Sequence, residues 1–181
     1  MTSIVDKILA ISDAMDDQRL PFAFGGALAL AFCTERARGT IDIDINVFVG
    51  QREAKRVLDA LPKPIGHTDG DLRNLELDGQ IRLRWDQTPV DLFLDTTEFH
   101  VEAAQRRQVH EFDGRQIPFL GCSDLAVFKA FFNRTKDWAD LEEMIAMRAL
   151  NIDQTIGVLV RYLGEDDDRV VRLRDLSAPG G

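Results

Sequence analysis

Residues 22–50 read FAFGGALALAFCTERARGTIDIDINVFVG, and two patterns within them decide the fold class. The first pattern is an apolar run that meets Gly25 and Gly26 and continues as an alanine-rich apolar segment through residue 32. It predicts a short strand, a tight turn and a helix. Glycines in such a turn let a phosphate approach the backbone N–H groups at the start of the helix; a plain turn is the alternative interpretation.

The second pattern is the alternation of isoleucine and aspartate from residue 41 to residue 45. It is typical of a strand, in which residues two apart share a face and lie roughly 6.5–7 Å apart. Asp42 and Asp44 are therefore expected on one face, and Ile41, Ile43 and Ile45 on the other. Paired carboxylates suit one or two Mg²⁺ ions, whereas the alternative is an edge strand with a solvated acidic face.

The glycine turn and the Asp-x-Asp strand together resemble the nucleotidyltransferase superfamily, which has the polymerase-β-like fold and a third acidic residue on a neighbouring strand. Asp91 is the candidate for this third position. Val90, Leu92 and Leu94 alternate as a buried face, so Asp91 is expected on the opposite face of its strand. Asp95 fits the position less well because it ends the strand.

A closer resemblance is to the AbiEii-type branch of this superfamily, the nucleotidyltransferase toxins of bacterial abortive-infection and toxin–antitoxin systems. It rests on two sequence motifs, Arg-x-Thr-x-Asp-x-Asp over residues 38–44 and Arg-Thr-Lys-Asp-Trp-Ala-Asp-Leu over residues 134–141. The resemblance covers residues 20–145, although Gly26 stands where many active members carry Ser. It implies that the nucleotide is bound by Gly25, Gly26, Arg38, Thr40, Lys129, Arg134 and Asp137.

The resemblance implies an enzyme that moves a nucleoside monophosphate from a nucleoside triphosphate (NTP) to an acceptor hydroxyl with two Mg²⁺ ions. Asp42, Asp44 and Asp91 are implied to be both catalytic residues and metal ligands. The branch further implies a toxin that acts on tRNA or protein and has a cognate antitoxin as partner. Two alternatives remain open: a catalytically silent nucleotide-binding or antitoxin-like partner protein, and a nucleotidyltransferase with a small-molecule acceptor, similar to the aminoglycoside enzymes.

The basic residues have simpler interpretations when the resemblance is set aside. Lys129 would lie on the solvated face of an apolar helix, and Arg134 with Asp137 would form an ordinary helix ion pair. Arg82 and Arg84 alternate with apolar residues, so we expect them to be exposed, with acceptor binding as the less favoured interpretation.

Composition narrows the class of protein further. The chain has 181 residues and a formal net charge of −9, which argues against a broad nucleic-acid-binding surface. No apolar run reaches the roughly 20 residues of a membrane span and no signal peptide is evident, so we expect a cytoplasmic protein with no membrane partner. The two cysteines, Cys33 and Cys122, are expected to be reduced and packed, and the three histidines show no zinc-ligand spacing.

The hydrophobic periodicity predicts an α/β (α+β) fold, with a small mixed sheet flanked by helices and a C-terminal helical segment. Helices are expected over residues 4–15 and 52–61. One hairpin is expected to turn at Asp78-Gly79 and another at Asp113-Gly114.

The C-terminal third of the chain is predicted to be helical. The pattern extends over residues 123–163, with breaks near Thr135 and Asn151, and Ser123 and Gly164 are expected as caps. We therefore expect a nucleotidyltransferase core over residues 1–122 and a helical segment over residues 123–181, packed on the core as one compact domain.

Overall fold

Two compact units make up the fold in this computed structural model, which describes residues 2–36 and 39–178. The sheet unit comprises Met1–Leu28 and Arg38–Leu120, and the helical unit comprises Ala29–Ala37 and Gly121–Gly181. The division falls between Leu120 and Gly121, and a short segment from the N-terminal part of the chain belongs with the C-terminal helices.

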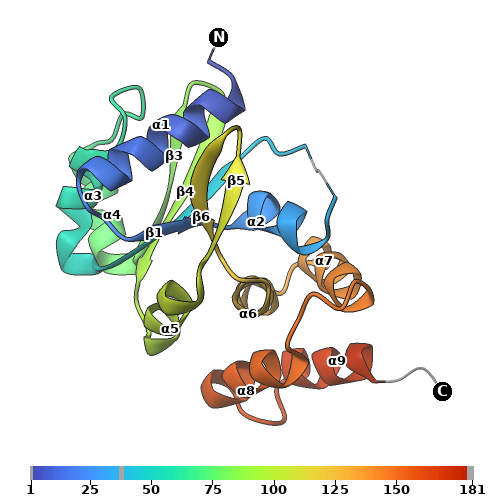
Figure 1. Ribbon diagram of the computed structural model, residues 1–181. Helices are drawn as coiled ribbons and strands as arrows, with labels where there is room; N and C mark the ends of the chain where they lie inside the picture. Colours follow the sequence, from blue (N-terminus) through green and yellow to red (C-terminus); the bar gives the residue numbers. More distant parts are fainter. Residues whose placement is uncertain (1, 37–38, 179–181) are drawn as a thin grey trace. The chain divides into compact units, whose positions relative to one another are not determined.

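The sheet unit is built on a mixed sheet, in which six strands of the described chain lie in the order β3-β4-β2-β1-β6-β5 (Figure 1). The strands are β1 (Phe22–Phe24), β2 (Ile43–Gly50), β3 (Gln80–Trp85), β4 (Thr88–Asp95), β5 (Gln108–Phe112) and β6 (Arg115–Phe119). β2 runs parallel to β4 and β1 runs parallel to β6, whereas the other neighbours are antiparallel. This mixed sheet with flanking helices confirms the predicted α/β class, and β5–β6 confirms the hairpin at Asp113-Gly114.

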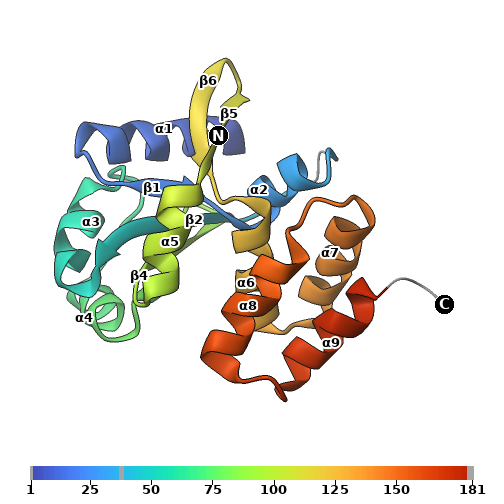
Figure 2. The ribbon, with the colours of Figure 1, turned by 60° about the horizontal axis from the view of Figure 1, so that its bottom comes forward.

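Helices flank the sheet, and Figure 2 shows α3 beside α4 and α5 beside the strands β2 and β4. α1 begins with a reciprocal capping box between Ser3 and Asp6, which satisfies backbone N–H groups at its first turn. The first two predicted helices are confirmed as α1 and α3. The helices of this unit are α1 (Ile4–Asp17), α3 (Ala54–Ala60), α4 (Asp69–Asp78) and α5 (Glu98–Arg106), with the 3-10 turn η1 (Gln51–Glu53) before α3.

The hairpin expected at Asp78-Gly79 is wrong. Asp78 ends helix α4, and Gly79 caps that helix in the left-handed conformation, with φ +68°. A capping box between Thr68 and Asp71 starts the helix, and this local signal overrides the apparent alternation of leucines. The hairpin is instead formed by β3 and β4, whose tight turn contains Asp86.

Lys7 of α1 is buried, which is rare for lysine, and it contacts the turn of this hairpin. Its Nζ donates to the Trp85 carbonyl and to Thr88 Oγ1, both at 3.0 Å, and lies 3.4 Å from Asp86 Oδ2. Because Lys7 is buried, these contacts replace the water that its ammonium group loses on folding.

We expect Lys7→Met to lower the free energy of unfolding by about 1–3 kcal/mol, because a buried acceptor then lacks its donor. Urea unfolding followed by circular dichroism measures this change. Lys55→Met is the matched control: Lys55 is exposed and pairs with Asp59 across one helical turn, so its loss should change stability by about 0.5 kcal/mol or less. Equal losses in the two variants would contradict the role of Lys7.

The helical unit contains α6 (Cys122–Phe132), α7 (Thr135–Ala146), α8 (Ile152–Leu163) and α9 (Asp168–Ser177). The breaks predicted near Thr135 and Asn151 are confirmed, as is the cap at Gly164. The predicted N-cap at Ser123 is wrong: Gly121 holds that position, and Ser123 Oγ instead accepts from the Asn151 N–H at 2.9 Å. Within the described ranges, no helix is long and apolar enough to span a membrane.

The expectation of two reduced thiols is also wrong, because Cys33 and Cys122 form a disulfide. Cys33 ends α2 (Gly26–Cys33), a helix that starts in the sheet unit, and Cys122 begins α6. Their Cα atoms are 5.6 Å apart although 89 positions separate them in sequence. Whether two cysteines this far apart in sequence come close depends on the tertiary fold, so their spacing alone does not predict the disulfide.

We expect the oxidised protein to lose about 2–4 kcal/mol of unfolding free energy when it is treated with a phosphine reductant, because a cross-link over a long loop constrains the unfolded chain. Denaturant unfolding with and without the reductant measures this loss. The double variant Cys33→Ser/Cys122→Ser is the control and should not respond to the reductant. A wild-type protein that is equally insensitive would contradict the disulfide.

Candidate active site

Two of the three predicted carboxylates lie directly opposite one another on adjacent strands. Asp44 of β2 is in register with Asp91 of β4, and the two strands are parallel neighbours. Adjacent strands are about 4.8 Å apart, so the two side chains rise from one face of the sheet at close range. Ile43 and Ile45 are buried on the other face, as the alternation predicts.

Asp42 lies just before β2 and is positioned by Thr40. The Thr40 hydroxyl oxygen is 2.7 Å from the Asp42 carbonyl oxygen and 3.0 Å from its carboxylate Oδ1, and it also accepts from the Asp42 N–H at 3.3 Å. Because the strand begins only at Ile43, the prediction of Ile41 as part of the opposite strand face is wrong; this side chain is 82% exposed. Thr40, predicted to contact the nucleotide, thus contacts the first carboxylate of the motif.

The glycine turn packs directly against Asp44. The Gly25 N–H donates to the Asp44 carbonyl at 2.9 Å, and Gly26 opens α2 with φ +53°. A Cβ atom on Gly26 would lie 1.8 Å from Asp44 Oδ2, so only glycine leaves room for this carboxylate. The strand, turn and helix predicted from residues 22–32 are therefore present, and they place Asp44 beside the N-terminus of a helix, where negative charge is favourable.

Arg82 pairs with a predicted site carboxylate, although the sequence predicted only an exposed side chain, with acceptor binding as the less favoured interpretation. It is in register with Asp91 on β3, and its Nε and Nη2 each donate to one carboxylate oxygen of Asp91 at 2.6 Å. These hydrogen bonds, and the negative charges of Asp91 and then of Asp42 and Asp44, raise the pKa of Arg82. Placing the hairpin turn at Asp86 would have revealed this pair, because that turn sets Arg82 opposite Asp91.

The donor chemistry of the three carboxylates suits Mg²⁺, which prefers oxygen ligands. Their side chains are not yet gathered: among the residues that the structure describes, no three His, Cys, Asp or Glu side chains form a group that could hold a metal ion. Arg82 takes both oxygens of Asp91. A cation that binds Asp91 at this face therefore meets a carboxylate already paired with a positive charge.

Lys129, Arg134 and Asp137 form an ion-pair network inside the helical unit. Lys129 Nζ lies 2.7 Å from Asp140 Oδ2 and 3.7 Å from Asp137 Oδ1, and Lys129 is buried rather than on a solvated face. Arg134 donates from Nε and Nη2 to the two oxygens of Asp137 at 2.6 and 3.1 Å. The two acidic residues thus support the basic ones, while the Arg134 side chain stays 52% exposed.

The remaining predicted nucleotide ligand, Arg38, lies outside the described residues. The structure places Asp42, Asp44, Asp91 and the two glycines in the sheet unit, with Asp44 opposite Asp91 and Thr40 hydrogen-bonded to Asp42. It places Lys129, Arg134 and Asp137 together in the helical unit.

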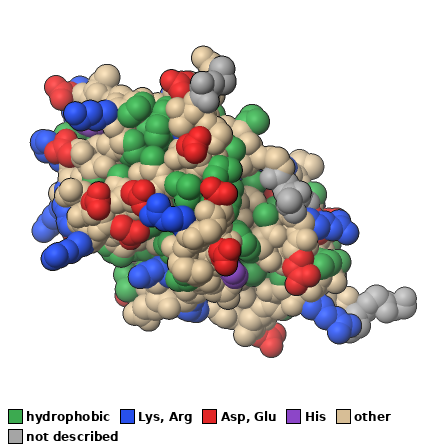
Figure 3. Space-filling model, turned by 45° about the horizontal axis from the view of Figure 1, so that its top comes forward, with side chains coloured by type: hydrophobic (Ala, Val, Ile, Leu, Met, Phe, Trp, Pro, Cys, Tyr) green, Lys and Arg blue, Asp and Glu red, His purple; other side chains and the backbone are tan. Residues whose placement is uncertain are grey.

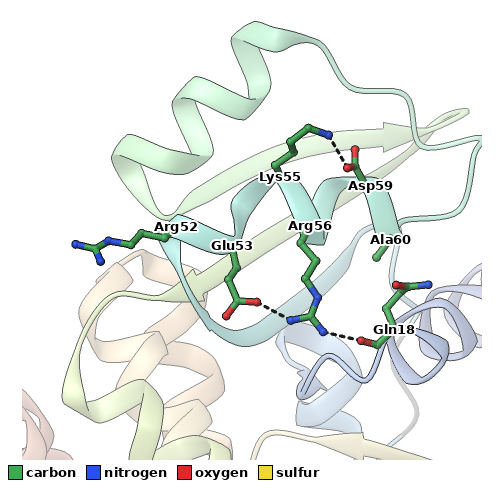
Figure 4. A pocket seen from close by; sticks show the side chains of 7 residues that line it. All are labelled: Gln18, Arg52, Glu53, Lys55, Arg56, Asp59 and Ala60. Atoms are coloured by element: carbon green, nitrogen blue, oxygen red, sulfur yellow. Dashed lines mark hydrogen bonds and ion pairs between the residues drawn. The ribbon is translucent and has the colours of Figure 1, made fainter.

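A separate polar pocket of about 520 Å³ lies between the end of α1 and the start of α3, and it contains none of these carboxylates (Figure 4). Two of its cations are paired there: Arg56 bonds to Glu53 and to the Gln18 carbonyl, and Lys55 bonds to Asp59. On the face that Figure 3 presents, acidic and basic side chains are interspersed. Neither observation adds a second candidate site.

Comparisons with known proteins place the fold. No protein-family model matches the chain, and no curated protein sequence matches it. Among solved structures, the chain is similar to ANT(2'')-Ia in complex with adenylyl-2''-tobramycin, with 17% identity over 96% of this chain and 98% of the other and a TM-score of 0.59. ANT(2'')-Ia is an aminoglycoside nucleotidyltransferase.

Two further structures agree with this result. A solution structure of the antibiotic-resistance factor ANT(2'')-Ia has 18% identity, covers 94% of this chain and 89% of its own, and has a TM-score of 0.50. An antigenic nucleotidyltransferase-like protein from Paracoccidioides brasiliensis has 14% identity, coverage of 91% and 90%, and a TM-score of 0.51. These likenesses do not single out the AbiEii-type branch, which stays a prediction, but they show that the chain has the nucleotidyltransferase fold.

Proposed function

We propose that the protein is a nucleotidyltransferase that moves a nucleoside monophosphate from an NTP to an acceptor hydroxyl. One observation carries the proposal: Asp44 and Asp91 face each other on parallel neighbouring strands, beside a glycine turn that opens a helix. Asp42, which is two residues before Asp44 and is held by Thr40, is the third proposed carboxylate. In this fold, such a face combines phosphate-binding backbone N–H groups with oxygen ligands for cations.

The three carboxylates are the proposed ligands of two Mg²⁺ ions. When bound, such ions neutralise phosphate oxygens and stabilise the charge of an in-line displacement. Asp42 and Asp44 are proposed to hold the metals, and Asp91 to complete the site and accept the proton of the acceptor hydroxyl. The acceptor oxygen then bonds to the α-phosphorus while the bond to the bridging oxygen breaks and pyrophosphate leaves.

The turn at Gly25 and Gly26 is the proposed phosphate cradle, since it lies at the N-terminus of α2 beside Asp44. The Gly25 N–H is bonded to the Asp44 carbonyl, so the proposed phosphate donors are the N–H groups from Gly26 onward. The proposal also keeps Arg38, Lys129, Arg134 and Asp137 as residues of nucleotide binding, following the resemblance. Arg134 is the most direct of these to test, because its guanidinium group is half-exposed. Weaker NTP binding by Arg134→Gln, in a variant that circular dichroism shows to be folded, would support that role.

A small molecule is the acceptor that we favour. The neighbour ANT(2'')-Ia was captured with adenylyl-2''-tobramycin, an adenylylated small molecule, and the net charge of −9 suits a cationic acceptor better than a nucleic acid. The second candidate is a toxin of the AbiEii type that modifies tRNA or protein and is neutralised by a cognate antitoxin. Its support is the sequence motifs at residues 38–44 and 134–141.

Label transfer tests both candidates at once. Wild-type protein and Asp42→Ala are incubated with Mg²⁺ and each α-labelled NTP, together with aminoglycosides, total tRNA or cell protein, and pyrophosphate is measured. Transfer by the wild type alone establishes the enzyme and names its acceptor class. Metal-dependent NTP binding without transfer to any acceptor would favour the silent nucleotide-binding alternative and overturn the proposed activity.

A further inference from the structure

Arg82 occupies the carboxylate that the proposed metal site needs. Its Nε and Nη2 take both oxygens of Asp91 at 2.6 Å, and the Asp91 side chain is only 15% exposed. A planar guanidinium fork matches a carboxylate in this two-bond geometry better than a lysine ammonium does. The pair is thus stronger than a single surface contact, and it engages both oxygens of Asp91.

Two physical effects oppose a divalent cation at Asp91 while Arg82 is in place. The guanidinium takes one lone pair of each Asp91 oxygen, which lowers the negative charge available to a cation, and it repels the cation because both carry positive charge. The repulsion is short-ranged in salt solution, so it depends on contact with the site rather than on the net charge of the protein.

We infer that Arg82 is a positioning residue that competes with the divalent cation for Asp91 and thereby sets the cation affinity of the three carboxylates. The inference rests on the proposed function, because it takes Asp42, Asp44 and Asp91 as the cation ligands. In the absence of a cation, Arg82 offsets part of the charge of three neighbouring carboxylates. When the cation binds, Arg82 releases at least one oxygen of Asp91, and its half-exposed side chain can turn toward solvent.

The matched control lies on the same strand. Arg84 is two residues beyond Arg82, so it lies on the same face of β3, but it is in register with Pro89 rather than with a carboxylate. Arg82→Gln and Arg84→Gln therefore remove the same charge from the same face, and only the first frees Asp91. Arg82→Lys keeps the charge but loses the two-bond fork.

Direct titration with Mn²⁺, followed by electron paramagnetic resonance of the free ion, measures the affinity without any reaction. We expect Arg82→Gln to bind Mn²⁺ about tenfold more tightly than the wild type, because the variant removes a positive charge beside the cation and frees Asp91 from its ion pair. Arg84→Gln should stay within about twofold, because exposed charges are screened. Arg82→Lys should fall between the wild type and Arg82→Gln.

Arg82→Gln/Asp91→Asn separates this inference from the proposed function, because it should lose the gain in affinity. Equal affinities in the wild type, Arg82→Gln and Arg84→Gln, all abolished by Asp91→Asn, would overturn the competition but leave the metal site standing. Mn²⁺ binding that is unaffected by Asp91→Asn and Asp44→Asn would instead remove the carboxylates as cation ligands. In that case both the inference and the proposed metal-dependent function would fail.

Discussion

Asp44→Asn is expected to lower kcat/KM for nucleotidyl transfer by more than about 100-fold, because even the partners of metal ligands affect activity by about 10–100-fold. Asn retains the shape of the side chain and removes its negative charge. Asp44 is the residue where the site converges: it is in register with Asp91 and lies against Gly26 at the start of α2. Labelled-product assays at several NTP concentrations measure the loss, and circular dichroism verifies that the variant folds.

Asp95→Asn is the control for this prediction. Asp95 lies on the same strand as Asp91 but at its end, where it is in register with Gly50 rather than with another carboxylate. We expect its kcat/KM to stay within about threefold of the wild type, since Asp95 is in register with a glycine and is not a proposed cation ligand. A folded Asp44→Asn protein with full activity would remove this carboxylate from the proposed mechanism.

Local sequence patterns were sufficient to predict those features of the site that are set by residues close together in the sequence. The alternation around Asp44 and Asp91 indicates which face each side chain takes, because strand periodicity is a property of consecutive residues. The turn at Gly25-Gly26 is likewise a local signal. The pairing of β2 with β4, by contrast, brings these segments together across the sheet, and only the superfamily resemblance anticipated it.

Features that depend on tertiary context could not be predicted in the same way. The dipeptide Asp78-Gly79 suits both a hairpin turn and the end of a helix, and the capping box at Thr68 decides between them. Because the hairpin turn was predicted at Asp78-Gly79 rather than at Asp86, the pairing of Arg82 with Asp91 was not predicted. The Cys33–Cys122 disulfide is a second case, since nothing near either cysteine specifies its partner.

Gly26→Ala is the second variant for which we expect a large effect, on stability and on activity together. An L-residue with φ near +53° costs roughly 1–2 kcal/mol, and the new Cβ would lie 1.8 Å from Asp44 Oδ2 and 2.6 Å from its Cγ. The carboxylate must therefore turn away from α2, which removes it from the position opposite Asp91. We expect a loss of kcat/KM of about 100-fold, comparable to the loss of a metal ligand's support.

A double-mutant cycle separates the steric clash from the backbone strain. Because the clash is with the carboxylate of Asp44, Gly26→Ala should cost about 1 kcal/mol less unfolding free energy in an Asp44→Ala background than in the wild type. The backbone strain remains in both backgrounds, so the cost should not vanish. Gly66→Ala, where a Cβ meets nothing within 4 Å, should change stability by about 0.5 kcal/mol or less. Additive costs of Gly26→Ala and Asp44→Ala would show that the turn does not constrain the carboxylate. A serine at position 26 would bring the same Cβ clash with Asp44. We therefore expect Gly26→Ser to lose stability and activity in this chain, although many superfamily members carry serine there.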